Sequence, residues 1–181
     1  MLTIPFAHFY DAVSLVLGEL KDVSVTLSIQ YPDLPVKSAD GSETVRNTKR
    51  TAADQITVSG LLANGAQSSS IVHGGAAFKG EPNAIWRVEG EKGVLDVRQD
   101  DAFGIAFSMS FRIRLQSFES GEVDEIEIKE DRPGPPGNVG RLYDAFADGE
   151  YYPDWKWAVK RHAWVDAVQK SGDSRKVVSY A

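Results

Sequence analysis

Residues 55–73 read QITVSGLLANGAQSSSIVH, and this stretch decides the fold. Two strand-like segments flank Asn64-Gly65, a dipeptide that strongly favours the two-residue turn of a β-hairpin. In the first segment apolar and polar residues alternate, so every second side chain lies on the same face of a sheet. The stretch therefore predicts a β-hairpin that is buried on one side.

Strand patterns continue on both sides of this hairpin. Each of these segments alternates apolar with polar residues, and the second contains a turn of its own near Glu91-Lys92-Gly93. The segments are 23–31, 84–98, 103–118 and 122–130. Phe111 falls on the apolar side of its strand, so we expect Phe111→Asp to unfold the domain by placing an unpaired charge among apolar strands. Residues 31–44 contain two prolines and Asp40-Gly41, and they indicate a loop.

Helical spacing is found only towards the two ends of the chain. Residues 6–18 form the first predicted helix, and residues 138–148 and 154–171 form two more after DRPGPPGN at 131–138, which breaks the strand pattern. Successive strands with helices gathered at the ends are typical of an α+β fold. We expect an open, mostly antiparallel β-sheet with helices packed on one face.

The other face of this sheet is predicted to carry small polar side chains. Such a face can be solvated, or it can allow the sheet of a second copy to approach closely, and both interpretations remain open. The residues are Ser24, Thr26, Ser28, Gln30, Thr57, Ser59, Ser108, Ser110 and Gln116.

Composition limits the class of protein. The 181 residues fit a single domain over 1–181, and the absence of cysteine excludes disulfides, thiolate metal sites and a cysteine nucleophile. The 26 acidic and 20 basic residues give a net charge of −6, which disfavours direct binding of nucleic acid. Neither a signal peptide nor an apolar run long enough to cross a bilayer is evident. We therefore expect an intracellular protein, cytoplasmic or nuclear, with no membrane contact.

Few residues qualify as catalytic or ligand-binding. His8 and Asp11 are three residues apart, so on a helix they share a face and the carboxylate could orient the imidazole. His73 and His162 have no partner at metal-ligand spacing, and no metal site is expected. Gly74-Gly75 and the GEKG turn at 90–93 lack the strand–turn–helix context of a phosphate-binding loop.

Two further features have an ordinary explanation and a functional one. Aromatic residues gather around the start of the last predicted helix, where they either pack that helix on the sheet or bind a partner. They are Tyr151, Tyr152, Trp155, Trp157 and Trp164. The acidic run from Glu122 to Asp131 is interpreted as a charged sheet edge that prevents edge-to-edge aggregation.

Four segments in order carry a resemblance to a known family. They are HFYDAVSLVLGE at 8–19, WRVEGEKGVLDV at 86–97, NVGRLYDAFADGE at 138–150 and PDWKWAVKRHAWVDAVQKSGDSRKV at 153–177. Together they resemble the C-terminal domain of the Gfo/Idh/MocA oxidoreductases, closest to the branch of the fungal galactose-pathway transcriptional repressor. The resemblance covers essentially the whole chain.

The resemblance implies a two-domain protein of which this chain is the second half. An N-terminal Rossmann domain binds NAD(P) in full-length relatives, but this sequence contains neither a dinucleotide fingerprint nor the family's Glu-Lys-Pro motif, so no cofactor is expected in this chain. The family's dehydrogenases typically place an Asp four residues before the His that corresponds to His8. Here that position is Ile4, which cannot hold a proton. His8 is the one candidate catalytic residue that remains.

Two functions follow from the resemblance, and whether the chain is an enzyme stays open. The first is a non-catalytic, oxidoreductase-like domain that forms a homodimer through the outer sheet face and binds a protein partner or a sugar-like ligand. The alternative is the truncated substrate-binding domain of an NAD(P)-dependent sugar or polyol oxidoreductase. A small-molecule-binding α+β module unrelated to dehydrogenases ranks last, because it would not explain the ordered match.

Overall fold

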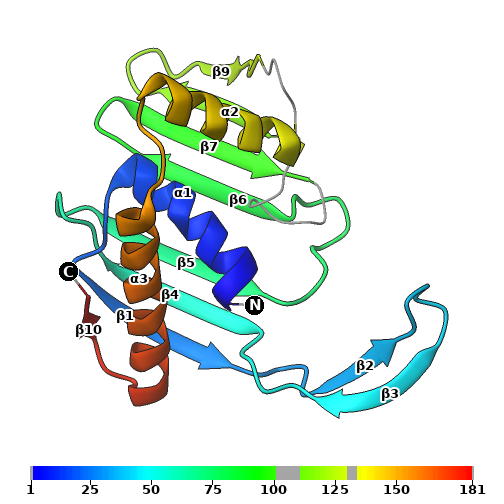
Figure 1. The fold of residues 1–181 in the computed structure, drawn as a ribbon. Helices are drawn as coiled ribbons and strands as arrows, with labels where there is room; N and C mark the ends of the chain where they lie inside the picture. The colour runs from blue at the N-terminus through cyan, green and yellow to red at the C-terminus, as the bar shows by residue number, and fades with distance from the viewer. Residues whose placement is uncertain (1, 101–110, 130–133, 181) are drawn as a thin grey trace. The chain divides into compact units, whose positions relative to one another are not determined.

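The hairpin at residues 55–73 forms as predicted. Strand β4 (Gln55–Leu61) pairs antiparallel with β5 (Gln67–His73), and the turn between them contains Gly65 with a φ of 91°. Strand β1 (Asp22–Ser28) pairs with the other edge of β4, and the short β10 (Val178–Ser179) pairs with β1. The sheet order is β10-β1-β4-β5, and every pair is antiparallel (Figure 1).

The computed structural model describes residues 2–100, 111–129 and 134–180. The chain divides into two compact units, which are described separately. Unit 1 comprises Met1–Gly75 and Trp155–Ala181, and unit 2 comprises Ala76–Asp154. The single domain over 1–181 stays a prediction.

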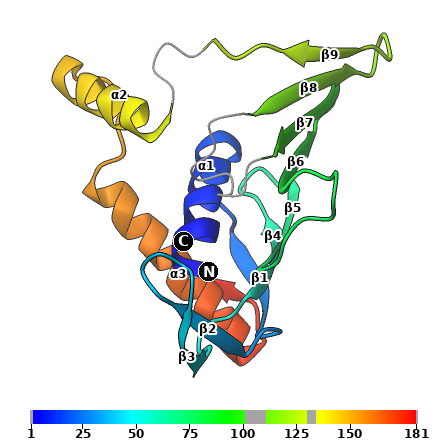
Figure 2. The same cartoon turned by 90° about the vertical axis from the view of Figure 1, so that its right-hand side faces the viewer.

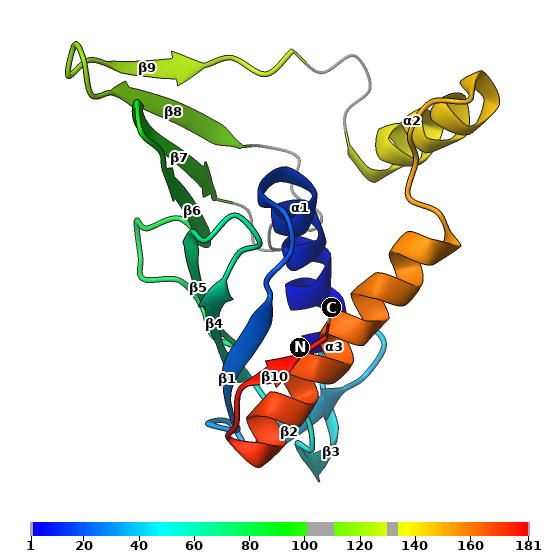
Figure 3. The same ribbon diagram turned by 90° about the vertical axis from the view of Figure 1, so that its left-hand side faces the viewer.

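In unit 1 the helices cover one face of the sheet. A π-helical segment, η1 (Leu2–Phe6), leads into α1 (Ala7–Leu17), and α3 (Trp155–Ser174) lies on the same side of the sheet (Figures 2 and 3). The Tyr10 ring of α1 stacks on the Trp164 ring of α3 with centroids 4.1 Å apart. Alternate residues of β1 and β4 complete this core, because a strand presents every second side chain to the helices. The fully buried apolar side chains include Phe6, Tyr10, Leu20, Val23, Ile56, Val58, Trp164 and Val168.

Ser171 ties α3 to β1. Strand β10 pairs only with Asp22 and Val23 of β1. The next N–H on this edge of β1, that of Val25, therefore needs another acceptor. The Val25 N–H donates to Ser171 Oγ over 3.1 Å, and this hydroxyl lies 2.6 Å from the Lys176 carbonyl oxygen that accepts its proton. Ser171 and Val25 are both buried, so the Val25 N–H has no access to water, whereas Lys176 is exposed. The hydroxyl therefore continues the hydrogen bonding of the sheet beyond its short edge strand.

Helix α3 approaches β1 closely at the next residue. An added Cβ at Gly172 would lie 2.5 Å from side-chain carbons of Leu27, well inside van der Waals contact. Glycine is thus required for this distance between helix and strand.

Unit 2 contains the second sheet. Its strands are β6 (Ala84–Glu89), β7 (Gly93–Gln99), β8 (Arg112–Ser117) and β9 (Val123–Ile126), in that order and all antiparallel. Helix α2 (Gly134–Asp148) belongs to the same unit. The α+β fold class, the open antiparallel sheets and the helices at the chain ends are confirmed. The sheet is nevertheless divided, since residues on β5 and β6 are not paired as strands.

Residues 31–44 were expected to form a loop, and this expectation is wrong. Strands β2 (Asp33–Lys37) and β3 (Thr44–Lys49) form a separate hairpin that projects from the β1–β4 sheet (Figure 1). Pro35 is tolerated because a two-stranded ribbon has two free edges, where a missing N–H breaks no hydrogen bond. The turn is organised by Asp40, whose carboxylate accepts a hydrogen bond from the Ser42 N–H over 3.1 Å.

A buried carboxylate fixes the base of this hairpin. Asp54 accepts hydrogen bonds from the backbone N–H groups of Gln30 and Tyr31, each over 2.8 Å, and lies 3.3 Å from Arg50 Nε. Burial alone would raise the pKa of Asp54, but these donors outweigh it and hold the pKa below its ordinary value. The two strands of the hairpin therefore leave the sheet at a defined point.

Other boundaries also differ from the prediction. Helix α2 begins at Gly134 rather than near 138, because Pro135 and Pro136 occupy its first turn, where no backbone N–H has a partner within the helix. Strand β10 was not expected, since two residues carry no periodicity. Half of the strand expected over 103–118, the part with Ser108 and Ser110, lies outside the described residues. Phe111 is half-buried directly before β8, and its predicted effect on stability stays a prediction.

Ser171→Ala should destabilise unit 1 by about 1–3 kcal/mol, because the buried Val25 N–H loses its acceptor. Urea unfolding followed by circular dichroism measures the change. Ser174→Ala is the matched control, since its exposed hydroxyl bonds only to the Lys170 carbonyl of its own helix. Equal stability of the two variants would contradict the role assigned to Ser171.

Candidate functional site

A group of polar side chains joins α1 to α3 within unit 1. We call it the α1–α3 polar cluster. Arg161 is at its centre: Nη1 donates to Ser14 Oγ over 2.7 Å, Nη2 pairs with Glu19, and the guanidinium lies 5.0 Å from the Trp157 ring centre. The members are Asp11, Ser14, Glu19, Trp157, Lys160, Arg161 and Tyr180.

Asp11 is held by α3. Its Oδ1 accepts a hydrogen bond from Trp157 Nε1 over 2.7 Å and lies 3.8 Å from Arg161 Nε. His8 lies on the same helix with an exposed side chain, and Ile4 is 57% exposed. The carboxylate that was expected to orient His8 thus has structural partners of its own, which come from the far end of the chain. A catalytic role of His8 stays a prediction.

Glu19 depends on its cationic neighbours. Burial of this carboxyl opposes its ionisation, but hydrogen bonds from Arg161, Tyr180 and Lys160 outweigh burial and hold the pKa of Glu19 below its ordinary value. The Tyr180 hydroxyl donates to Glu19 over 2.9 Å, and Lys160 Nζ lies 3.2 Å from it. The cluster therefore connects α3 and Tyr180, which follows β10, to the segment after α1.

The other histidines do not join a site. His73 at the end of β5 and His162 on α3 are both exposed, and the described ranges contain no group of three His, Asp or Glu side chains placed to hold a metal ion.

The aromatic residues near the start of α3 separate into two kinds. Trp164 is buried against Tyr10, and Trp157 belongs to the polar cluster, so these two pack the helix. Trp155 and Tyr151 are 87% and 67% exposed. Packing therefore explains only part of the group.

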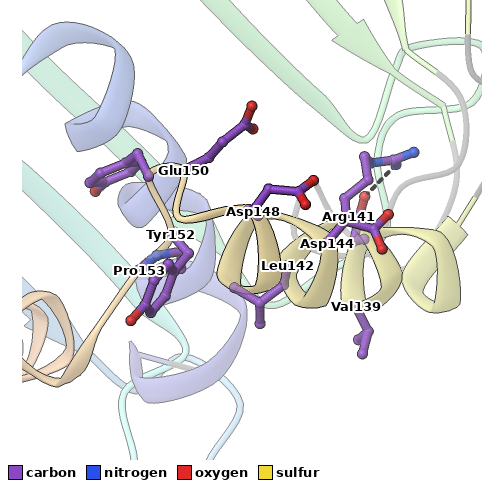
Figure 4. Close-up of a pocket in the computed structure, with 11 residues that line it drawn as sticks. Val139, Arg141, Leu142, Asp144, Asp148, Glu150, Tyr152 and Pro153 are labelled. Atoms are coloured by element: carbon purple, nitrogen blue, oxygen red, sulfur yellow. Dashed lines mark hydrogen bonds between the residues drawn. The ribbon is translucent and has the colours of Figure 1, made fainter.

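A cavity of about 660 Å³ lies along α2 and the segment after it, within unit 2. Figure 4 shows Val139 and Leu142 on one side of the helix and the carboxylates of Asp144, Asp148 and Glu150 turned away from them. Phe146 and Tyr152 meet edge to face, with ring centres 5.3 Å apart. Three carboxylates and one cation, Arg141, line the cavity, so its net charge is negative and disfavours a phosphate.

A row of charged residues crosses the unit 2 sheet. Arg87, Asp96, Arg114 and Glu125 are direct neighbours on β6, β7, β8 and β9, and we call this row the charge ladder. Arg114 Nη2 and Arg98 Nε each donate to Asp96 Oδ1 over 2.7 Å, and Arg87 Nη2 donates to Asp96 Oδ2 over 2.9 Å. These hydrogen bonds hold the pKa of Asp96 far below its ordinary range.

Sequence reasoning missed the charge ladder. Gln116 was expected on the outer face, and it lies on β8 two residues beyond Arg114, on the same face. The prediction did not consider the register of the strands. The turn at residues 90–92 places Arg87 opposite Asp96, and this pairing could have been derived from the hairpin.

A comparison with protein families shows to which family the chain belongs. The family described as the Gal80p C-terminal domain matches residues 1–99, more than half of the chain. The chain belongs to the Gal80p C-terminal-domain-like family. No curated protein sequence matches it.

Solved structures agree with this Gal80p-like assignment. A super-repressor mutant of Gal80p from Saccharomyces cerevisiae has a TM-score of 0.83 at 18% identity, over 99% of this chain and 50% of that one. The transcriptional regulator Gal80p from Kluyveromyces lactis has a TM-score of 0.78 at 21% identity, over 99% of this chain and 45% of that one. Levoglucosan dehydrogenase has a TM-score of 0.72 at 16% identity, over 99% of this chain and 51% of that one.

These Gal80p-like similarities confirm the expected family and fold. The identities are low, so the structural matches show the fold alone, and the chain spans about half the length of those structures. Levoglucosan dehydrogenase has also been solved in complex with NADH and L-sorbose. Within the described part of the chain, no helix combines the length and apolar character needed to cross a membrane.

Arg161→Met should destabilise unit 1 by about 2 kcal/mol at pH 7, because the largely buried Glu19 loses its Arg161 partner and keeps only the half-exposed Lys160 as a cation. Glu19 has a lowered pKa in the folded state, so its stabilisation is present above its unfolded pKa of about 4.3 and is lost as the pH falls through the folded pKa. The difference between wild type and variant should therefore shrink at pH 3. Urea unfolding at both pH values measures it, with Lys156→Met, an exposed position on α3, as control. A difference that does not change with pH would contradict the role of Glu19.

Proposed function

We propose that this chain is a non-catalytic, oxidoreductase-like domain that dimerises and binds a protein partner or a sugar-like ligand, as a regulator rather than an enzyme. The observation that carries the proposal is a pair of features around His8. Ile4 occupies the position where the family's dehydrogenases typically have an Asp, and Asp11 is hydrogen-bonded to Trp157. The intracellular location, cytoplasmic or nuclear, is part of the same proposal.

Proton transfer from a sugar hydroxyl needs a positioned acid–base group. Ile4 has no ionisable atom, and the Asp11 carboxylate has its near oxygen occupied by an indole N–H and faces the Arg161 cation. Of these three residues, His8 and Asp11 can accept a proton, and Asp11 already bonds to Trp157 beside a cation. This set supports binding of a polar ligand better than oxidation of one.

Dimerisation is proposed through the sheet face opposite the helices. In unit 1 this face carries small hydroxyl side chains on β1 and β4 and the exposed apolar residues Leu61 and Ile71, which are 43% and 69% exposed. Small side chains allow a second sheet to approach, and the apolar residues supply area to bury. The face comprises Ser24, Thr26, Ser28, Gln55, Thr57, Ser59, Leu61, Gln67, Ser69, Ile71 and His73.

The alternative is a truncated substrate-binding domain of an NAD(P)-dependent sugar or polyol oxidoreductase. The similarity to levoglucosan dehydrogenase over 99% of this chain favours it. In that case His8 would line the substrate site, and NAD(P) would be bound by a domain that this sequence does not contain.

Turnover separates the two functions once an NAD(P)-binding domain is supplied. A fusion of this chain to the NAD(P)-binding domain of a dehydrogenase with the same fold, given NAD+ or NADP+ and a series of sugars and polyols, should produce no reduced nicotinamide, as measured by absorbance. Isothermal titration with the same sugars should detect binding that His8→Ala weakens. Oxidation of any sugar by the fusion would overturn the non-catalytic proposal.

Thr57→Arg should convert the dimer to a monomer, because Thr57 is at the centre of the hydroxyl-rich face and a long cation there prevents close approach of a second sheet. Analytical ultracentrifugation at high micromolar concentration measures the mass. Ser174→Arg, at the exposed end of α3, is the control and should leave the dimer intact. A wild-type chain that sediments as a monomer would contradict the dimer itself.

A further inference from the structure

Helix α2 carries an apolar stripe that is largely exposed. Its four members recur at the spacing i, i+3, i+4 and i+7, which places them along one side of the helix. A helix in a folded protein takes most of its stability from packing such a side against another element. The four are 39% to 69% exposed, and they are Val139, Leu142, Tyr143 and Phe146. An exposed stripe of this kind marks an interaction surface.

The cavity of about 660 Å³ runs beside this stripe, and we call it the α2 groove. One side of it is apolar, with Val139 and Leu142 from the stripe. The other side is charged, since the carboxylates of Asp144 and Asp148 are turned away from these two residues (Figure 4). Residues 144 and 148 are one helical turn apart, so the two carboxylates follow the length of α2. Glu150, just beyond the end of the helix, adds a third.

The charges of the α2 groove are unbalanced. Arg141 is the one cation among the described residues that line it, and its Nη2 donates to Asn138 Oδ1 over 2.8 Å. One guanidinium against three carboxylates leaves the lining with a net charge of −2. The groove is therefore apolar on one side and acidic on the other. Its complement is a segment that is apolar on one side and basic on the other.

We propose that the α2 groove binds a basic amphipathic helix of a partner protein. This inference rests on the proposal that the chain binds a protein partner, and it names the chemistry of that partner. The apolar residues of the partner lie on the stripe of α2, and its Lys or Arg side chains meet the three carboxylates. Recognition of a helix in a groove uses apolar anchors at i, i+3 or i+4, and i+7, which is also the spacing of the stripe.

A second copy of this chain is disfavoured in the α2 groove by charge. Each copy brings one guanidinium and three carboxylates. Even if each Arg141 paired with a carboxylate of the other copy, two carboxylates of each copy would stay without a cation. This count holds whichever way the two helices run. Like charges that meet across an interface suppress the pairing.

A sugar is disfavoured by the apolar side of the groove. Sugar hydroxyl groups placed against the aliphatic side chains of Val139 and Leu142 lose their water without gaining a hydrogen bond. The Tyr152 ring, which also lines the groove, already packs edge to face against Phe146. The site therefore suits an amphipathic segment better than a polyhydroxylated molecule.

A fluorescent peptide tests the proposal. The probe has about 18 residues, enough to form a helix, with Leu at i, i+3, i+4 and i+7 and Lys on its other side. Fluorescence anisotropy measures its binding to the full chain. Asp148→Arg combined with Glu150→Arg should weaken binding about tenfold or more, because attractive contacts become repulsive. A peptide with Glu in place of Lys should bind this double variant more tightly than it binds wild type.

Val139→Asp separates docking in the groove from general attraction between opposite charges. The added carboxylate would strengthen a purely electrostatic association with the basic peptide. In the groove it removes an apolar contact, so we expect binding to weaken. Tighter binding by Val139→Asp would overturn the proposal. If Val139→Asp lowers the mass of the wild-type dimer in analytical ultracentrifugation, a second copy occupies the groove and the proposal is likewise overturned.

A matched control makes the same charge change outside the groove. Glu119→Arg combined with Glu122→Arg alters two exposed carboxylates between β8 and β9 and should leave peptide binding unchanged, with folding of all variants checked by circular dichroism. Equal losses in the two double variants, or displacement of the peptide by a sugar, would overturn the assignment of the groove. If wild type does not bind the basic peptide, the inference fails, whereas the non-catalytic and dimer proposals keep their own tests by turnover and sedimentation.

Discussion

The docking of α3 on β1 is the contact on which unit 1 depends. Ser171 and Gly172 bring the last helix against the first strand, over a sequence separation of 146 residues between Ser171 and Val25. The aromatic stack of Tyr10 and Trp164 and the α1–α3 polar cluster both require this docking, since each takes residues from the two ends of the chain. Contacts this distant in sequence carry the entropy cost of closing the loop between them. Unit 2 lies within that loop, so the unit 1 core is completed only after both ends have met.

Much of this fold could be predicted from local pattern. The turn at Asn64-Gly65 and the alternation in 23–31 and 84–98 correctly indicate β1, β4, β5, β6 and β7, because period and turn chemistry are local properties. Prolines misled the prediction twice. Pro35 suggested a loop where an isolated ribbon tolerates it, and Pro135 and Pro136 suggested a break where they begin a helix. In both places the missing N–H would have had no partner, and only the tertiary arrangement reveals that.

The candidate site was less predictable than the fold. Spacing correctly put His8 and Asp11 on one helix, but the partner of Asp11 is Trp157, whose approach no local pattern encodes. The charge ladder is the opposite case. Its pairing of Arg87 with Asp96 follows from the register of one hairpin, yet each strand taken alone shows only a charged residue at an ordinary outward position.

The hydrogen bonds of the Asp54 carboxylate fix the point where the β2–β3 hairpin leaves the β1–β4 sheet. The Asp54 carboxylate accepts hydrogen bonds from Gln30, Tyr31 and Gln55 at the point where the two strands leave. The hairpin can therefore change in length at its tip during evolution without altering the spacing of β1 and β4. Steps of two residues on each strand keep every side chain on the same face of the ribbon. Related chains are free to differ in the reach of this element while sharing the same sheet beneath it.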